Sequence, residues 1–358
     1  LTRRPGVRSA LYEVFIGRSA AATTSEKSLP YVRTRPHSTM SFFGIGGGKQ
    51  PEFRRILVTG ANRGIGLAIV HRCLVEHEDT HVVLACRSAA RGDEAVAGLV
   101  SENAEWKERL TVLEMDTASS DSVTAAATTL AEKFGKSPAP LYGIVNNAGI
   151  ASGTIADVLN VNVRGVKRVD DAFIPLLDPK NGRIVQMSSG AASGCVSRSS
   201  AERQAFFIDP KVTWAGIDKV MNEAEAYPNG VKDFEANGIG GSMGGHYGLS
   251  KALLCSYTML VAREHPKLKV NSCSPGFVAT DIFGTMLPWW APVPNMFLRF
   301  VAEKAMGAKT PDEGAFSTMH LLFADSLEGN GRYYGSDGKR SPLDTYRKPG
   351  SPPPYEGP

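Results

Sequence analysis

Short apolar runs alternate with segments of helical length from residue 54 onward. Each run ends in small or polar residues, which is typical of a buried strand that reaches the edge of a sheet. Alternating strands and helices predict an α/β fold: a doubly wound parallel sheet covered by helices on both faces, with ligands bound at the carboxyl ends of the strands. The expected strands lie within residues 54–60, 81–86, 110–116, 142–149, 183–189 and 268–276.

The first 50 residues have a different composition from the rest. Six arginines stand among many Ser, Thr and Ala residues with only two acids. This composition predicts an organelle transit peptide, for a mitochondrion or a plastid. The alternative is a disordered leader, with Met40 as the start of a shorter cytoplasmic form. The glycine run at 44–50 is not a phosphate-binding P-loop, because Gln50 stands where Ser or Thr must bind magnesium, and we interpret it as a linker.

The C-terminal residues 341–358 are rich in proline, which predicts a disordered tail. They include the sequence PPPY at 352–355, which could bind a proline-reading WW-type module in an extended conformation. A match this short often arises by chance. Residues 51–340 are expected to form one domain.

The composition of the whole chain narrows the function. The net charge is only +4 over 358 residues, without a long basic block in the body of the chain, so nucleic-acid binding is disfavoured. Five cysteines without C-x-x-C spacing disfavour a disulfide framework and a metal site, and they indicate a reducing compartment. The segment 286–301 is short and broken by prolines, so we expect no transmembrane helix and interpret it as an apolar flap over a pocket.

Three glycines stand where the first expected strand meets the next helix. Gly60, Gly64 and Gly66 are spaced G-x-x-x-G-x-G, which allows a tight turn and a close approach of the main chain to a pyrophosphate at the helix amino end. The signal is weak alone, since any tight turn between a strand and a helix can use glycine. A further strand about twenty residues later strengthens the interpretation of a dinucleotide site.

The end of the second expected strand indicates which dinucleotide binds. An acid there would hold the ribose hydroxyls of NAD, but the sequence is Cys-Arg-Ser, with Arg87 at its centre. Arg87, together with Arg63 in the glycine turn, can instead contact the 2′-phosphate of NADP. The predicted cofactor is therefore NADP(H). The alternative is that both arginines only face solvent.

Tyr247 and Lys251 are four residues apart and would share one face of a helix. Free tyrosine has a pKa of about 10, so a neighbouring ammonium that stabilises the phenolate favours proton transfer near neutral pH. The alternative is the polar edge of an ordinary amphipathic helix. The spacing alone fits both interpretations.

Five short sequences occur in a fixed order: TGANRGIG at 59–66, NNAG at 146–149, SS at 188–189, YGLSK at 247–251 and PGFVATD at 275–281. Together they resemble the short-chain dehydrogenase/reductase family, over about residues 54–340, and within that family the monomeric carbonyl reductases that use NADPH. The resemblance implies a single Rossmann-type domain with a helical insertion, residues 190–246, before the catalytic helix.

By this resemblance Tyr247 is the general acid, and Lys251 is its partner and also binds the nicotinamide ribose. Ser189 would orient and polarise the substrate carbonyl. Ser188 is the less favoured alternative for that role.

An asparagine completes the expected catalytic set. Asn162 matches the family residue that positions a water in the proton relay, while Asn160, two residues earlier, leaves the register open. The catalytic residues implied by the resemblance are Asn162, Ser189, Tyr247 and Lys251.

The resemblance also assigns contacts with the cofactor. Asp116 would contact the adenine, Asn147 would steady the central sheet near the cofactor, and Val278 with Thr280 would hold the nicotinamide carboxamide. Simpler roles are open: Asp116 as a helix cap and Asn147 as a turn residue. The full expected set is Gly60, Asn62, Arg63, Gly64, Ile65, Gly66, Arg87, Asp116, Thr117, Asn147, Tyr247, Lys251, Pro275, Gly276, Val278 and Thr280.

These residues imply the reduction of a ketone or aldehyde by NADPH, with the proton from Tyr247. The alternatives are an alcohol or retinol-type dehydrogenase that works in the oxidative direction, and a non-catalytic NADP-binding scaffold, which has no physical need for all four catalytic residues. Trp289, Trp290 and Phe297 in the segment 283–300 favour a hydrophobic carbonyl substrate. In similar reductases the insertion covers a surface used for association, so a monomer is expected.

Overall fold

The computed structural model describes residues 53–137, 139–241, 245–278 and 307–351, all within the unit Gln50–Pro358. Several predictions lie outside the described residues: those for the leader, the apolar segment 283–300, Thr280 and the PPPY sequence. Within the described ranges, no helix is both long and apolar enough to cross a membrane.

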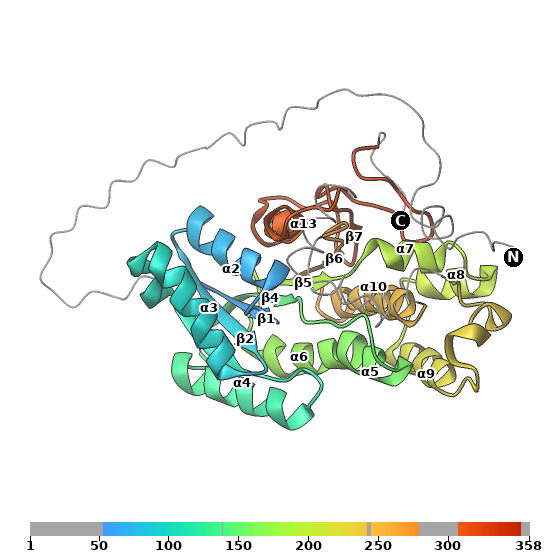
Figure 1. Ribbon diagram of the computed structural model, residues 1–358, viewed down its shortest axis with the longest axis horizontal. Helices are drawn as coiled ribbons and strands as arrows, with labels where there is room; N and C mark the ends of the chain where they lie inside the picture. Colours follow the sequence, from blue (N-terminus) through green and yellow to red (C-terminus); the bar gives the residue numbers. More distant parts are fainter. Residues whose placement is uncertain (1–52, 138, 242–244, 279–306, 352–358) are drawn as a thin grey trace, which may run out of the picture. The chain divides into compact units, whose positions relative to one another are not determined.

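Seven parallel strands form one sheet in the order β3-β2-β1-β4-β5-β6-β7 (Figure 1). The chain order switches direction between β1 and β4, which is where doubly wound sheets bind ligands. Six of the strands were predicted and are confirmed, whereas the two-residue β7 was not predicted. The strands are β1 (Arg54–Thr59), β2 (Thr80–Cys86), β3 (Leu110–Glu114), β4 (Leu141–Asn146), β5 (Arg183–Met187), β6 (Lys269–Cys273) and β7 (Tyr333–Tyr334).

Alternate residues of each strand pack into different layers. In β1, Ile56 and Val58 belong to one apolar cluster and Leu57 to the other, and all three are fully buried. A parallel sheet covered on both faces requires such continuous apolar runs. The predicted fold class is therefore confirmed.

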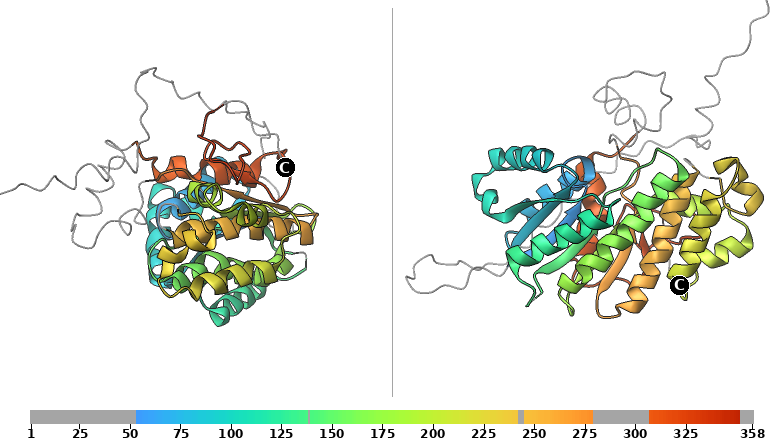
Figure 2. Two further views of the ribbon diagram at one scale, coloured as in Figure 1. Left: turned by 90° about the vertical axis from the view of Figure 1, so that its right-hand side faces the viewer. Right: turned by 90° about the horizontal axis from the view of Figure 1, so that it is seen from below.

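Helices form a layer on each face of the sheet (Figures 1 and 2). One layer contains α2 (Gly64–Glu76), α3 (Ala89–Glu102) and α13 (Pro311–Phe323). The other contains α4 (Ser120–Phe134), α6 (Gly165–Phe173) and α10 (His246–Glu264). Shorter elements join them: η1 (Ala104–Arg109), α5 (Ile155–Leu159), the π-helical turn η2 (Asn160–Arg164) and η3 (Ile174–Leu176).

The predicted helical insertion lies between β5 and α10. Its helices are α7 (Gly190–Val196), α8 (Ala201–Phe207) and α9 (Trp214–Glu225), followed by the 3₁₀ turns η4 (Gly230–Asp233) and η5 (Glu235–Asn237). Ser200 and Thr213 begin α8 and α9, and each side chain accepts a hydrogen bond from a main-chain N–H of the first turn. α9 packs against both α5 and α10.

One arginine fastens the insertion to the π-helical turn η2. Arg164 donates to Asn222 Oδ1 at 2.9 Å and pairs with the carboxylates of Asp218 and Glu225. All three partners lie on α9. Because the Arg164 side chain is only 21% exposed, this network is screened less by water than an ordinary surface pair.

The C-terminal segment after β7 was expected to be disordered from residue 341 onward. Residues 341–351 are among those described, and they are held by tertiary contacts. Arg347 donates to Asp337 Oδ1 at 2.6 Å, and the Gly350 N–H donates to Asp337 Oδ2 at 2.9 Å.

Candidate active site

The glycine turn brings the amino end of α2 to the carboxyl end of β1. Gly60 and Gly64 have φ of +64° and +56°, a conformation that favours glycine. A Cβ at Gly66 would lie 2.4 Å from Gly60 O, so no side chain fits there. The cap residue Arg63 makes no side-chain capping hydrogen bond, so the first N–H groups of α2 remain available to an anion.

Asn147 connects this turn to the neighbouring strand β4. Its Nδ2 donates to Thr59 O at 2.9 Å and to Gly60 O at 3.2 Å. The side chain therefore bonds the adjacent strand rather than its own main chain. Asn147 thus fixes the turn at the switch point between β1 and β4.

The ends of β2 and β3 place the residues expected at the adenosine half of the cofactor. Arg87 follows β2 directly and is exposed, as is Arg63. Asp116 and Thr117 follow β3, and Asp116 Oδ1 accepts a hydrogen bond from the Ala118 N–H at 3.0 Å. Asp116 is not the helix cap, since Ser119 caps α4.

Ser189 and Tyr247 lie together at the carboxyl end of β5. Their side chains are hydrogen-bonded, which lowers the pKa of Tyr247, but burial has the larger effect and raises that pKa above its ordinary value. Ser189 Oγ also accepts from the Ala191 N–H at 3.2 Å, so it caps α7. Tyr247 in this structure is a neutral phenol that can donate a proton.

Lys251 lies one helical turn below Tyr247 and is 4% exposed. Its Nζ donates to Met187 O at 2.7 Å and lies 5.7 Å from the centre of the Tyr247 ring. Burial lowers the pKa of Lys251 to about 8, against the smaller opposing effect of the Cys255 and Cys273 thiols. Two N–H donors of the ammonium remain for a ligand.

Ser188 points away from this group. Its Oγ donates to Lys251 O at 3.2 Å and lies 3.1 Å from the Cys255 sulfur, with the side chain 1% exposed. The two serines therefore have different contacts. Ser188 joins β5 to α10, whereas Ser189 is hydrogen-bonded to Tyr247.

Asn162 is fully buried in the π-helical turn η2. It bonds both main-chain groups of Ile150, at 2.9 and 2.8 Å, and donates to Ser250 Oγ on α10 at 3.0 Å. Asn160 instead accepts from Arg168 at 2.7 Å. The π turn places Asn162, and not Asn160, against α10. Both Nδ2 donors are used, so only Oδ1 can accept a further bond, from a water for example.

Ser274, which follows β6, joins two loops of the site. Its Oγ accepts from the Gly190 N–H at 3.0 Å and from the Gly276 N–H at 3.1 Å. Pro275 and Gly276 form the turn, with φ +86° at Gly276, and Val278 is buried against Gly314 of α13. The expected contacts of the nicotinamide thus reach the same edge of the sheet as Ser189, apart from Thr280, which is outside the described residues.

Gly149 belongs to this site and was missed as a separate position in the sequence. A Cβ added there would lie 3.1 Å from Asn162 Oδ1 and 3.4 Å from Lys251 Nζ. The NNAG sequence contains the signal, since a glycine directly after a strand often marks a close approach.

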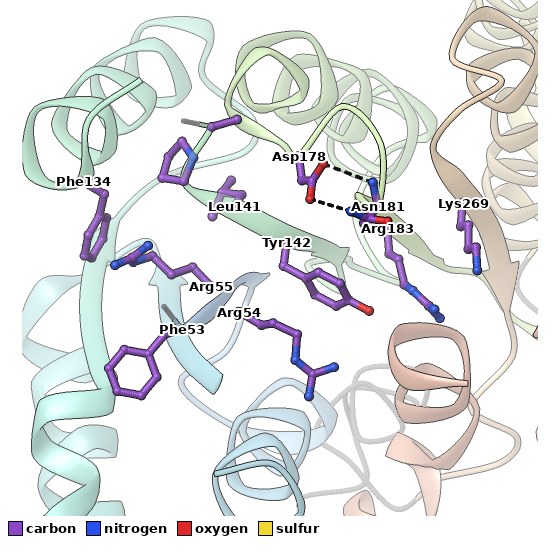
Figure 3. A pocket seen from close by; sticks show the side chains of 12 residues that line it. Phe53, Arg54, Arg55, Phe134, Leu141, Tyr142, Asp178, Asn181, Arg183 and Lys269 are labelled. Atoms are coloured by element: carbon purple, nitrogen blue, oxygen red, sulfur yellow. Dashed lines mark hydrogen bonds between the residues drawn. The ribbon is translucent and has the colours of Figure 1, made fainter. Parts of the chain in front are cut away.

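A separate pocket of about 520 Å³ lies at the opposite, amino edge of the sheet (Figure 3). Its arginines are engaged by protein groups. Arg54 makes two hydrogen bonds to Asp79, at 2.6 and 2.7 Å, and Arg183 donates to Leu321 O and Ala324 O. The pocket supplies no residue to the candidate active site.

Known proteins are similar to this chain in sequence and in fold. The model of the short chain dehydrogenase family matches residues 54–201. The (+)-neomenthol dehydrogenase of Arabidopsis thaliana is 31% identical over 262 residues, which are 64% of this chain and 84% of that protein. Carbonyl reductase (NADPH) 1 of Rattus norvegicus is 30% identical over 303 residues, which are 80% of this chain and 97% of that protein. The structure of salutaridine reductase from Papaver somniferum is similar with a TM-score of 0.61 and 27% identity, and covers 79% of this chain and 99% of its own.

The chain belongs to the short-chain dehydrogenase/reductase family. It is an oxidoreductase that acts on alcohol or carbonyl groups and binds a nicotinamide cofactor, and its relatives include carbonyl reductases.

Proposed function

We propose that the protein reduces a hydrophobic ketone or aldehyde to the alcohol with NADPH. The observation that carries the proposal is the hydrogen-bonded pair Ser189 and Tyr247 beside the buried Lys251. A cofactor-binding scaffold has no physical need for this pair. The name of the rat relative, carbonyl reductase (NADPH) 1, supports both the reaction and the cofactor.

The residues present fit NADPH at the carboxyl edge of the sheet. The uncapped amino end of α2 and the close approach at Gly66 suit a pyrophosphate. Arg63 and Arg87 are exposed and would supply positive charge to a 2′-phosphate, and no acid directly follows β2 to hold free ribose hydroxyls. Lys251 would bind the nicotinamide ribose. When bound, the cofactor supplies a hydride to the carbonyl carbon.

Side chains of the protein bind and protonate the carbonyl oxygen of the substrate. Ser189 donates a hydrogen bond that orients the carbonyl and stabilises the negative charge that develops on its oxygen. Tyr247 donates its proton to that oxygen. The Lys251 ammonium, held by Met187 O, then stabilises the phenolate. Asn162 holds the loop at Ile150 against α10 and so fixes the distance between these groups.

Replacing Tyr247 by phenylalanine tests the chemistry. In Tyr247→Phe, we expect NADPH-dependent turnover of a panel of carbonyl compounds to fall by about 10²–10⁴-fold, the usual contribution of a general acid. NADPH binding, followed by cofactor fluorescence, should remain within a few-fold of wild type. Tyr142→Phe is the matched control, because Tyr142 bonds Leu322 O at the amino edge of the sheet (Figure 3). Full turnover in Tyr247→Phe contradicts the proposal.

A titration with both dinucleotides tests the cofactor. NADPH should bind more tightly than NADH, and Arg87→Ala should weaken NADPH binding by about 10-fold, equivalent to ~1.4 kcal/mol, while leaving NADH binding unchanged. Tighter binding of NADH by the wild-type protein would overturn the assignment of NADP(H).

The insertion supports the further proposal of a monomer. α9 packs against α5 and α10, so it occupies helix surface on which a second copy could otherwise pack. Sedimentation at low micromolar concentration checks this, and a stable dimer or tetramer contradicts it.

A further inference from the structure

The chain after β7 folds back on itself and returns to the edge of the sheet. The Gly335 N–H donates to Lys339 O and the Ser341 N–H donates to Tyr333 O, both at 2.8 Å. These bonds make a tight turn that contains Asp337. The turn directs residues 341–351 toward α7 (Figure 1).

A buried ion pair fixes this C-terminal segment. The Arg347 guanidinium donates to Asp337 Oδ1 at 2.6 Å and to Ser341 Oγ at 2.9 Å, and the Gly350 N–H donates to the second Asp337 oxygen. The Arg347 and Asp337 side chains are only 8% and 18% exposed. A charge-assisted pair with this little exposure holds a segment more firmly than a surface pair does.

Tyr346 precedes this anchor and lies beside the residue that follows Ser189. Its Cε2 is 3.5 Å from the position that a Cβ would occupy on Gly190, the residue after Ser189. Standard bond lengths then place the ring edge within about 9 Å of the Ser189 Cα. A substrate whose carbonyl is bound at Ser189 reaches the ring with one further ring or a short chain of carbons.

Two loops next to the proposed site carry further exposed apolar side chains. Val231 of η4 lies against Gly245, where a Cβ would be 2.9 Å from Val231 Cγ1, and Gly245 immediately precedes α10. Phe277 follows Gly276, which shares the Ser274 hydroxyl with Gly190. Val231, Phe277 and Tyr346 are 42%, 39% and 59% exposed. Exposed apolar side chains on the loops that border the proposed site suit an apolar ligand.

We propose that Tyr346 forms one wall of the substrate site and selects carbonyl compounds that carry an apolar ring next to the carbonyl. The aromatic face packs on the ring of the substrate, and the pair of Arg347 with Asp337 positions it. This inference rests on the proposed carbonyl reduction, and it assigns the preference among substrates to the C-terminal segment as well as to the insertion.

The test compares a ring ketone with a small carbonyl compound on the full chain. In Tyr346→Ala, kcat/KM for 1-tetralone should fall by about 10-fold through a higher KM, the size of one lost aromatic contact, while kcat/KM for propanal should stay within about two-fold of wild type. Tyr346→Phe should resemble wild type, because the ring makes the contact. Arg347→Met should reproduce the loss for 1-tetralone, because the ring is no longer positioned.

A control variant separates a specific contact of Tyr346 with the substrate from a general effect of losing an exposed apolar side chain. Val75→Ala removes an exposed apolar side chain of α2, 54% exposed and remote from Ser189, and should change neither substrate. An equal loss for 1-tetralone and propanal in Tyr346→Ala, or no loss for either, overturns the inference.

A binding measurement separates this inference from the proposed function. In a Tyr247→Phe background, calorimetry should show that Tyr346→Ala weakens 1-tetralone binding by about 10-fold without any turnover. If the wild-type protein reduces no carbonyl compound but Tyr346→Ala still weakens 1-tetralone binding, the proposed reaction is wrong while the role of Tyr346 in ligand binding is supported. Equal affinity for 1-tetralone with and without the Tyr346 ring contradicts the inference that Tyr346 lines the substrate site.

Discussion

The main chain of Gly149 lies close to the Asn162 side chain, so that a side chain at position 149 would press on the Asn162 oxygen. A Cβ there would be 3.1 Å from Asn162 Oδ1, closer than most real contacts, and 3.4 Å from Lys251 Nζ, which is at ordinary contact distance. Two of the proposed catalytic residues are therefore spaced by the absence of a side chain at a third position.

Gly149→Ala should shift Asn162 by a few tenths of an ångström and bring the new methyl group into contact with Lys251 Nζ. We expect kcat to fall by about 10-fold, because catalytic groups tolerate little displacement, and the free energy of unfolding to decrease by ~1–3 kcal/mol from overpacking. Steady-state kinetics and urea denaturation measure the two effects.

Gly98→Ala provides the control for Gly149→Ala. Gly98 lies in α3, and no atom lies within 4 Å of the position of its Cβ. Alanine there should stabilise the protein by ~0.5–1 kcal/mol with unchanged kcat. Equal kcat values in the Gly149→Ala and wild-type proteins would show that the site does not depend on this contact.

Cofactor affinity should depend on pH through Lys251. Burial lowers the pKa of Lys251 to about 8, so the side chain is an ammonium below that pH and a neutral amine above it. Affinity for NADPH should therefore be highest below pH 8 and fall by up to 10-fold per pH unit above it. Burial raises the pKa of Tyr247, so the phenol stays neutral across this range.

Two variants show whether this pH dependence of NADPH affinity comes from Lys251 or from Tyr247. Fluorescence titrations of NADPH between pH 7 and 9.5 should show the same decline in Tyr247→Phe as in wild type, and weak but pH-independent binding in Lys251→Met. A decline that disappears in Tyr247→Phe would instead belong to the tyrosine.

Stability should depend on pH through Asp170, a fully buried residue of α6. Each carboxylate oxygen accepts one amide hydrogen bond at 2.7 Å, from Asn146 and from Gln186, yet burial outweighs these bonds and raises the Asp170 pKa to about 7. The folded protein then holds this proton between about pH 4 and pH 7, whereas the unfolded chain releases it near pH 4. The free energy of unfolding should therefore fall as pH rises through this range, by up to ~1.4 kcal/mol per pH unit.

Asp170→Asn should remove this part of the pH dependence, as measured by urea denaturation at pH 5, 6, 7 and 8. Asp171→Asn is the matched control, because Asp171 is 59% exposed on the same helix and pairs with Lys167 at the surface. A slope that persists in Asp170→Asn would show that another group binds the proton.

The strands and the main site residues could be predicted from local patterns. Each of the six predicted strands is an apolar run with polar residues at its end, and the signal in that run does not depend on the rest of the chain. β7 has only two residues, Tyr333 and Tyr334, which is too short for any periodic pattern. Its place in the sheet comes from pairing with Ser272 and Cys273 of β6.

The remaining details depend on contacts between distant residues. The sequence leaves both Ser188 and Asn160 as candidates, and only the packing of β5 and of the π turn against α10 separates them from Ser189 and Asn162. Asp170 gives no signal, because a single acid in a helix is normally solvated.

For the C-terminal segment, amino-acid composition alone does not predict the contacts that the segment makes. Proline and glycine in residues 341–351 predict disorder, since the segment has few apolar groups to bury. The pair of Arg347 with Asp337 supplies the order instead. A tertiary ion pair of this kind leaves no local pattern in the sequence.

Arg164 holds the insertion to the rest of the domain through its contacts with α9, so the insertion could be exchanged as a unit if those contacts were kept. The proposed proton donor, its lysine and the glycine turn all lie outside residues 190–246, so a different insertion could be joined to the same chemistry. The helix that replaces α9 would still have to offer carboxylate and amide partners to position 164, which is separated from Asn162 by one residue. We therefore expect that any exchange of the insertion requires residue 164 and the facing surface of α9 to be changed together, while the residues of the proposed chemistry stay as they are.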